Sequence, residues 1–217
     1  MIDFHTHTLL SDGELLPAEL VRRAVAIGYK GIGLADHVDV SNIDFIVPRI
    51  VKAAKSLTSG KIKVVPGVEL THVPPKDIPA LVKYARYNGI KLVIVHGETI
   101  VEPVIPGTNA AALDANIDIL AHPGLITLKD AKTAAKKGIY LEITAKKGHS
   151  LTNGHVALTA HKAGAKLVIN TDSHAPDDLI TRERAVSVLI GSGLDMLRAR
   201  SVLRNSESLL RKFSFFY

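Results

Sequence analysis

The 217-residue chain contains no cysteine and no tryptophan, and aromatic residues make up only 5% of it. Without cysteine, neither disulfide bonds nor thiolate metal sites such as zinc fingers can form, so nitrogen and oxygen atoms must hold any bound metal. The scarcity of aromatic residues also argues against a platform on which nucleic-acid bases stack.

Long apolar runs are missing too, since none approaches the roughly 18 residues that a membrane span requires. Met1 leads directly into Ile2-Asp3-Phe4-His5, without the charged and apolar regions of a secretory leader. We therefore expect a cytoplasmic protein with no membrane partner.

The composition is that of a globular protein, with 47% hydrophobic and 22% charged residues. This length and composition predict one domain over residues 1–217. The formal net charge is +6, but the basic residues occur as dispersed doublets such as Arg22-Arg23 and Lys136-Lys137. They are typical of solvated helix faces, and a small anionic substrate fits the charge as well. Nucleic acid is an open but less favoured partner, and the oligomeric state is not predicted.

Short apolar runs alternate with amphipathic segments along the chain, and glycine ends four of those segments, at Gly28, Gly89, Gly138 and Gly164. Glycine is typical of helix C-termini because it readily adopts a left-handed conformation. Helices are expected over 17–27 and, near the end of the chain, over 177–190, 194–200 and 207–213. The apolar runs predict strands over residues 2–5, 31–35, 62–65, 92–95, 117–121, 139–143 and 167–170.

These strands should form a parallel sheet, because they are apolar throughout and the segments between them are long enough for crossover helices. Imidazole and carboxylate side chains follow most of the strands. The candidate metal ligands are His5, His7, Asp12, His37, Glu69, His96, His122, Asp172 and His174. Burying so many ionisable groups together without a cation would carry a severe desolvation cost.

The ligand set also bears on whether the sheet is open or closed. Seven strands spaced about 4.8 Å apart would separate the outer strands of an open sheet by roughly 29 Å. Bonds between a metal and nitrogen or oxygen are only about 2 Å long. If all these residues serve one cluster, the sheet must curl into a barrel of about seven βα units.

These motifs resemble the polymerase and histidinol phosphatase (PHP) superfamily. The resemblance rests on Asp3-Phe4-His5-Thr6-His7, Ser11-Asp12-Gly13, Ala35-Asp36-His37, Gly67-Val68-Glu69, His96, Ala121-His122-Pro123 and Thr171-Asp172-Ser173-His174. It covers essentially the whole chain and implies an α/β fold, a distorted (β/α)7 TIM-like barrel of parallel strands with outer helices.

The resemblance also implies two or three divalent metal ions, with Zn, Mn or Fe as candidates. His5, His7, Glu69 and Asp172 would hold the first ion, and Glu69 would bridge to a second held by His96 and His122. Asp12, His37 and His174 would hold a third, where some members have histidine at the position of Asp12. Catalysis is assigned to His5, His7, Glu69, Asp172 and His174.

The activity implied is hydrolysis of a small phosphate monoester, with histidinol phosphate as the named candidate, by a metal-activated hydroxide that attacks phosphorus in line. Lys146, Lys147 and His149, in the loop after the sixth strand, and Arg182 are candidate phosphate anchors. Surface solvation is the alternative for these residues. His72 is expected to have a structural loop role, His155 and His161 to lie on the surface, and Glu98 to be either a supporting or a solvated residue.

Two other functions remain open. One is a phosphodiesterase or 3'-5' exonuclease that acts on nucleotide or nucleic-acid ends. The other is non-enzymatic, an RNA-binding barrel like the protein subunit of ribonuclease P, although such relatives lack the metal ligands. The nine ligand-type residues favour catalysis.

Overall fold

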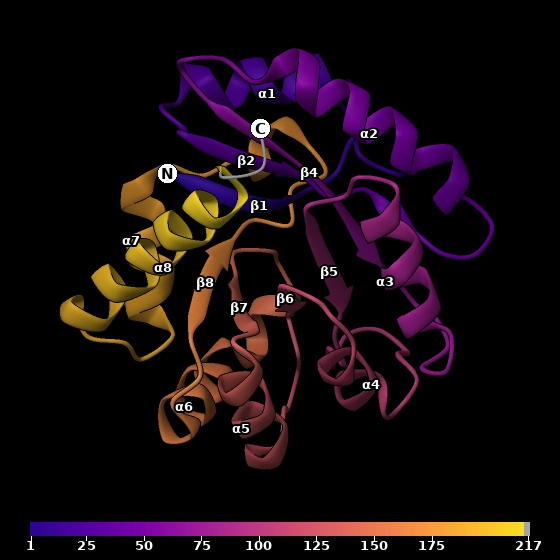
Figure 1. Ribbon diagram of the computed structural model, residues 1–217. Coiled ribbons are helices and arrows are strands. Elements are labelled where there is room, and N and C mark those ends of the chain that lie inside the picture. The colour runs from indigo at the N-terminus through magenta and orange to yellow at the C-terminus, as the bar shows by residue number, and fades with distance from the viewer. Residues whose placement is uncertain (215–217) are drawn as a thin grey trace.

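A computed structural model describes residues 1–214, in which parallel strands form a curled sheet (Figure 1). The strand order is β1-β2-β4-β5-β6-β7-β8, and the short β3 pairs with β4. The strands are β1 (Ile2–Thr6), β2 (Gly31–Leu34), β3 (His37–Val38), β4 (Lys63–Leu70), β5 (Leu92–His96), β6 (Ile119–Ala121), β7 (Tyr140–Thr144) and β8 (Leu167–Asn170). Consecutive neighbours in this order all pair in parallel, as the apolar strands predicted.

The two ends of the sheet meet where β1 lies beside β8. A parallel bridge joins Thr6 to Ser173, and the backbone N–H of His7 donates to the Ser173 carbonyl at 2.8 Å. Deeper along the strand, the N–H of Phe4 donates to Oδ1 of Asn170 at 2.9 Å. A side chain thus takes the place of a regular ladder partner, and the ring closes irregularly. The predicted distorted (β/α) barrel is confirmed.

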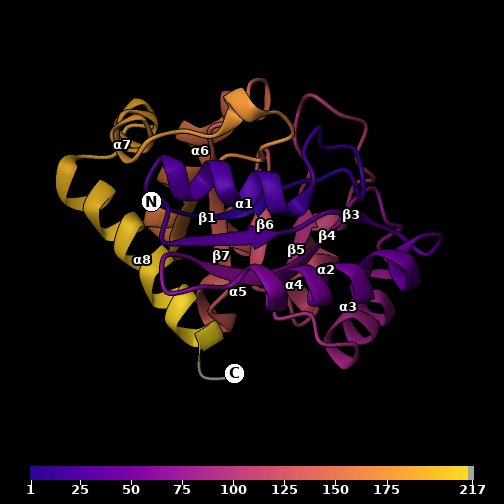
Figure 2. The same cartoon turned by 90° about the horizontal axis from the view of Figure 1, so that it is seen from above.

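Helices surround this barrel (Figures 1 and 2). The helices α1 to α6 lie between strands in the chain, and α7 and α8 follow the last strand, β8. They are α1 (Pro17–Ala26), α2 (Ile43–Leu57), α3 (Ile78–Tyr87), α4 (Thr108–Asp114), α5 (Leu128–Lys137), α6 (Asn153–Ala163), α7 (Arg182–Gly191) and α8 (Met196–Ser214), with short 3-10 turns at His149–Thr152 and Pro176–Asp178. The four glycines predicted to end helices all have positive φ, between 71° and 96°.

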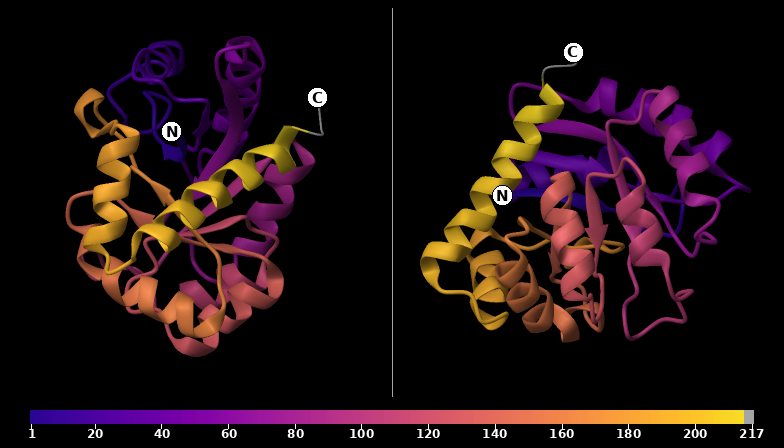
Figure 3. Two further views of the ribbon diagram at one scale, coloured as in Figure 1. Left: turned by 90° about the vertical axis from the view of Figure 1, so that its left-hand side faces the viewer. Right: turned by 60° about the horizontal axis from the view of Figure 1, so that its bottom comes forward.

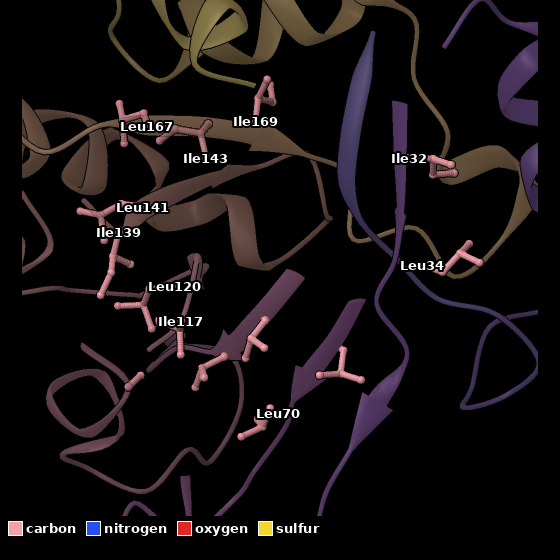
Figure 4. Close-up of a cluster of buried hydrophobic side chains, with 14 of the residues drawn as sticks. Ile32, Leu34, Leu70, Ile117, Leu120, Ile139, Leu141, Ile143, Leu167 and Ile169 are labelled. Carbon is pink, nitrogen blue, oxygen red and sulfur yellow. The ribbon is translucent and has the colours of Figure 1, made fainter. Parts of the chain in front are cut away.

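Two apolar cores follow from the alternation of side chains along each strand. Leu141 and Ile143 of β7, like Leu167 and Ile169 of β8, point outward and pack beneath the helices (Figure 4). Residues between them face the barrel interior, where a second cluster includes Phe4 and Val168. The interior above that cluster is polar, and it carries the candidate site.

The last helix closes the amino-terminal end of the barrel. Figure 3 shows α8 crossing one end of the strand ring. Phe213 of this helix is buried, and its ring meets that of Phe4 edge-on at 5.9 Å. Phe213 thus closes the underside of the barrel, while residues 215–217 lie outside the described part.

The predicted elements need three corrections. The third strand does not end at residue 65 but continues as β4 to Leu70, so Glu69 lies within the strand. Pro66 is tolerated because β4 changes partner there, pairing with β2 up to Pro66 and with β5 from Gly67.

The other two corrections concern the end of the chain. The helix predicted over 177–190 is interrupted between Pro176–Asp178 and α7. The helices predicted over 194–200 and 207–213 form the single helix α8. Polar residues in its middle interrupt the apolar pattern but have tertiary partners, since Asn205 donates to the carbonyl of Leu167 at 2.9 Å. Among residues 1–214, no helix combines the length and apolar character that crossing a bilayer demands.

Candidate metal centre

The nine residues predicted as metal ligands converge at the carboxyl-terminal mouth of the barrel. Nε2 of His5 lies 3.2 Å from Oε2 of Glu69, and Nε2 of His7 lies 3.1 Å from Oδ1 of Asp172. The imidazole of His122 stands 3.7 Å from both Glu69 and Asp172. Residues separated by more than 160 positions in the chain are therefore neighbours because the strand ring closes.

Ligand-type atoms gather into overlapping groups in which all atoms lie within 4.8 Å of one another. These groups are His5, His7 and Asp172; His5, Glu69 and His122; His7, Asp12, His37 and His174; His96, His122 and His149; and His72, His96 and Glu102. The first four groups include all nine predicted ligands and add His149. Atoms this close can be bridged by bonds of about 2 Å to a common ion.

Several atoms at the centre are buried without a hydrogen-bond partner. They are Nε2 of His5, both ring nitrogens of His7, Oε1 of Glu69, Nδ1 of His122 and Oδ1 of Asp172. Buried polar atoms are nearly always satisfied in folded proteins, so a cluster of exceptions needs an explanation. Nitrogen and carboxylate oxygen are the donor atoms that divalent zinc, manganese and iron accept. The donor set therefore fits divalent metal ions.

Three imidazoles of this centre are oriented in a common way. His5, His96 and His174 each place Nδ1 against an outer partner: Glu142 at 2.9 Å, the Gly97 carbonyl at 3.1 Å and the Asp172 carbonyl at 2.9 Å, respectively. His37 is the exception, since its Nδ1 contacts both Thr71 at 2.5 Å and the central Glu69 at 2.8 Å. In the other three imidazoles the second nitrogen, Nε2, faces the centre. Histidine ligands typically donate their other ring N–H in this manner, which fixes both ring orientation and tautomer.

Backbone strain is concentrated at the same place. Among described residues other than glycine, only His72, His122 and Asp172 have positive φ, at 52°, 25° and 53°. Such conformations are costly for residues with a side chain and cluster at functional sites. His122 and Asp172 are predicted ligands. His72 contacts Glu102, which in turn contacts the predicted ligand His96.

Three of the predicted ligands, Glu69, His7 and His122, have shifted pKa values that favour the forms that bind metals. Burial raises the pKa of Glu69, but the imidazoles of His5 and His37 outweigh it and hold that pKa well below its ordinary value. Burial and the neighbouring His37 lower the pKa of His7 to about 3. Burial and the neighbouring His96 keep the pKa of His122 well below its ordinary value.

His5 behaves differently, because the carboxylates of Glu69, Glu142 and Asp172 outweigh the effect of burial and raise its pKa well above the ordinary value. The ionised carboxylates thus favour a positive charge in the centre, which a proton on His5 or a bound metal ion can supply.

Glu142 is a candidate functional residue that was not predicted from the sequence. It is fully buried in the middle of β7, where its Oε1 lies 2.9 Å from Nδ1 of His5 and accepts from Nδ2 of Asn170 at 2.8 Å. Its Oε2 accepts from the backbone N–H of His122 at 3.1 Å. One carboxylate thus positions two predicted ligands. An acid between apolar residues in a buried strand was the available signal.

Two further acids hold the backbone around the centre. Asp3 accepts from the hydroxyl of Thr171 at 2.6 Å and from the N–H of His5, and burial raises its pKa to about 7. Asp36 accepts from the N–H of Thr8 at 2.7 Å and from the hydroxyl of Ser11 at 2.8 Å. Asp3 thus joins the strand of His5 to the segment that leads to Asp172, and Asp36 fixes the loop that carries Asp12.

The mouth of the barrel holds a pocket of about 630 Å³, lined among others by Asp12, His37, His72, His96, Glu102, Lys146, His149, Asp172 and His174. Glu102, which the sequence analysis also missed, reaches into it from the loop between β5 and α4. Hydrogen bonding from His96 lowers the pKa of Glu102 to about 2.

The candidate phosphate anchors are not all in this pocket. Nζ of Lys146 lies in it, 3.4 Å from Oδ2 of Asp178 and 2.9 Å from Nδ1 of His174. Lys147 is exposed and does not line the pocket. Arg182 lies with Met1 and Lys30, at the amino-terminal ends of β1 and β2, on the opposite side of the barrel. Its predicted anchoring role is therefore wrong, because α7 begins at the far end of the strands.

His149 is buried and is a member of one of the groups of ligand-type atoms. It is therefore placed as a metal ligand would be, and not as a surface anchor for phosphate. His155 and His161 lie exposed on α6, as predicted. Glu98 has a structural role, since its Oε1 accepts from the N–H groups of Gly107 and Asn109 at the start of α4. His72 is not only a loop residue, because its Nε2 contacts Glu102 at 3.1 Å.

Comparison with known proteins adds family and fold. The family model described as the PHP domain matches residues 3–178. An uncharacterized protein of Methanocaldococcus jannaschii is 49% identical over 195 residues, which cover 88% of this chain and 89% of that protein. A protein named probable phosphatase from Shewanella frigidimarina is 26% identical over 237 residues, covering 97% and 91%.

Two solved structures share the fold. A chain in the cryo-EM structure of archaeal ribonuclease P with mature tRNA matches with a TM-score of 0.73 and 17% identity, covering 98% of this chain and 91% of that one. The candidate histidinol phosphatase hisK from Listeria monocytogenes matches with a TM-score of 0.61 and 10% identity, covering 82% and 97%. At these identities the likeness concerns the fold alone.

Proposed function

Because the chain belongs to the PHP domain family, we propose that it is a metal-dependent phosphoesterase that hydrolyses a small phosphate monoester, as histidinol phosphatases do. The observation that carries this proposal is the convergence of nine imidazole and carboxylate side chains, several of whose buried donor atoms have no hydrogen-bond partner. A purely RNA-binding barrel would have no use for such a costly arrangement.

The residues would divide between two or three ions. His5, His7, Glu69 and Asp172 surround one position, His96 and His122 a second next to Glu69, and Asp12, His37 and His174 a third. When bound, divalent ions supply positive charge that neutralises phosphate oxygens and lowers the pKa of a coordinated water to near 7.

The chain itself positions the reactants. Outer partners hold the imidazoles so that Nε2 faces the centre, and the pocket of about 630 Å³ leaves room for a small substrate above it. Burial of Glu69 and Asp172 keeps water from screening their charges. Such preorganised electrostatics is what phosphate-ester hydrolysis requires.

Lys146 is the residue we assign to the substrate phosphate. Its ammonium group lines the pocket beside His174. We expect Lys146→Ala to raise KM for a phosphate monoester about 10-fold, because a charge-assisted hydrogen bond contributes roughly 1.5–3 kcal/mol. Lys147→Ala is the matched control and should leave KM unchanged. Steady-state kinetics of both variants measure KM. Equal KM values in the two variants would show that Lys146 does not bind the substrate phosphate.

Glu142 should act through the ligands it positions. We expect Glu142→Gln to weaken metal binding about 10–100-fold, since loss of a partner that orients ligands has effects of this size. Glu142 accepts from the N–H of His122 through one oxygen and from Asn170 through the other. The amide keeps the shape but has a single oxygen, so it can accept only one of these two hydrogen bonds at its original position. Competition against a chelator measures the affinity. Wild-type affinity in a folded variant would show that His5 and His122 are oriented without this carboxylate.

Substrate profiling tests the proposal as a whole. The metal-reconstituted protein should release phosphate from small monoesters faster than it cleaves diesters or nucleic-acid ends. A preference for diesters would favour the phosphodiesterase or exonuclease alternative. Tight binding of structured RNA by metal-free protein, without hydrolysis of any ester under any divalent metal, would favour the ribonuclease P-like alternative.

A further inference from the structure

His149 shares the arrangement of the predicted ligands, although the family resemblance assigns it no such role. Its Nδ1 lies 2.8 Å from the hydroxyl of Thr99, and the side chain is buried. Nε2 is thereby left to face the centre, as in His5 and His96. His155, on the same segment, does the reverse and directs Nε2 outward to the Ile126 carbonyl.

The ring of His149 also lies beside that of a predicted ligand. It stacks on His122 with centroids 4.2 Å apart and planes 14° apart. Donor nitrogens of His96, His122 and His149 all lie within 4.8 Å of one another. Three buried imidazoles that converge in this way match the donor preferences of a divalent ion.

Glu102 brings a carboxylate to the same place. Its Oε2 lies 3.0 Å from Nε2 of His96, and its Oε1 lies 3.3 Å from Nε2 of His149. The same oxygen that contacts His96, Oε2, also lies 3.1 Å from Nε2 of His72. His72 holds this position with a strained, left-handed backbone. A carboxylate that spans two inward-facing nitrogens is placed as an anionic ligand would be.

We propose that His149 and Glu102 complete the second metal position, so that His96, His122, His149 and Glu102 hold that ion and Glu69 bridges it to the first. His72 is then a positioning residue for Glu102. The loop between β5 and α4 and the loop after β7 become part of the metal site. This inference rests on the metal site of the proposed function, but it concerns residues outside the family's ligand set.

The test is titration of the metal-depleted full chain with Mn²⁺, with free ion counted by electron paramagnetic resonance. We expect Glu102→Gln to weaken one binding step at least about 10-fold, since even loss of a supporting residue has effects of 10–100-fold. The other steps should stay unchanged. His149→Ala should weaken the same step. Glu19→Gln on α1 and His155→Ala on α6 are the matched controls and should bind as wild type.

Unchanged binding steps in Glu102→Gln overturn the proposal. The side chain of Glu102 is 36% exposed on a loop, so the variant is expected to fold whatever the fate of His149→Ala. Unchanged steps combined with tighter binding of inorganic phosphate would overturn it as well, because Glu102 would then occupy the anion position. If the wild-type chain binds no Mn²⁺, the proposed function itself fails, which is a different outcome from normal wild-type binding with an unaffected variant.

Discussion

Glu69→Gln should lower kcat/KM for phosphate-ester hydrolysis about 10³-fold or more. Glu69 is fully buried in β4, where its carboxylate lies within 3.7 Å of imidazole nitrogens from His5, His7, His37 and His122. The amide keeps the shape but removes the charge that the two proposed metal positions would share. Metal ions supply several kcal/mol of transition-state stabilisation, and each 1.36 kcal/mol is a tenfold rate effect.

Steady-state kinetics after exhaustive chelation and stepwise metal addition measure this effect. Wild-type activity should vanish on chelation and return with metal, whereas Glu69→Gln should recover little at the same metal concentration. Glu19→Gln, a surface change on α1, is the control and should behave as wild type. Activity in Glu69→Gln within tenfold of wild type, or wild-type activity that survives chelation, would contradict a bridged metal centre.

Phe213→Ala should be among the most destabilising single changes in the chain. Phe213 is 2% exposed and seals the amino-terminal end of the barrel against Phe4. Truncating a buried phenylalanine costs about 3–5 kcal/mol through lost burial and a residual cavity. We expect a loss near 3 kcal/mol, since the last turn of α8 can shift toward the gap. For a chain of this size that loss lowers Tm by roughly 6–12 °C.

Thermal unfolding of the two variants at equal metal loading measures the difference. Leu197→Ala is the matched control on the same helix, because Leu197 is 73% exposed and surface changes stay within about 0.5 kcal/mol. If Phe213→Ala and Leu197→Ala lower Tm equally, α8 does not close the barrel in the way the structure describes.

The alternation of strands and helices could be predicted because it follows from short-range periodicity in the sequence. β2 and β8 are apolar on both faces, and the amphipathic segment of α1 ends before Gly28. The chemistry of the centre was equally visible, because imidazole and carboxylate residues are rare after buried strands. Misplaced boundaries came where tertiary contacts override the local pattern, as at Pro66 and in the middle of α8.

The remaining residues of the site could not be predicted, because their roles depend on which way the side chains face after the strand ring closes. Glu142 was hidden within an apolar strand, although Leu141 and Ile143 on either side pack outward and leave it pointing into the barrel. Glu102 lies on a loop with no regular period, and its approach to His96 depends on the path of that loop. Arg182 follows Asp172 and His174 closely in the sequence, yet it starts a helix at the other end of the strands.

Sequence alone determined the alternation of strands and helices, the absence of thiolate chemistry and the donor types available to a metal, because each follows from residue identity and local period. Tertiary structure decided the closure between β1 and β8 and which metal-binding atoms lie together. It also brought Glu142, His149 and Glu102 to the candidate metal centre. The physical reason is that these contacts join residues far apart in the chain, and only the packed barrel determines which of them meet.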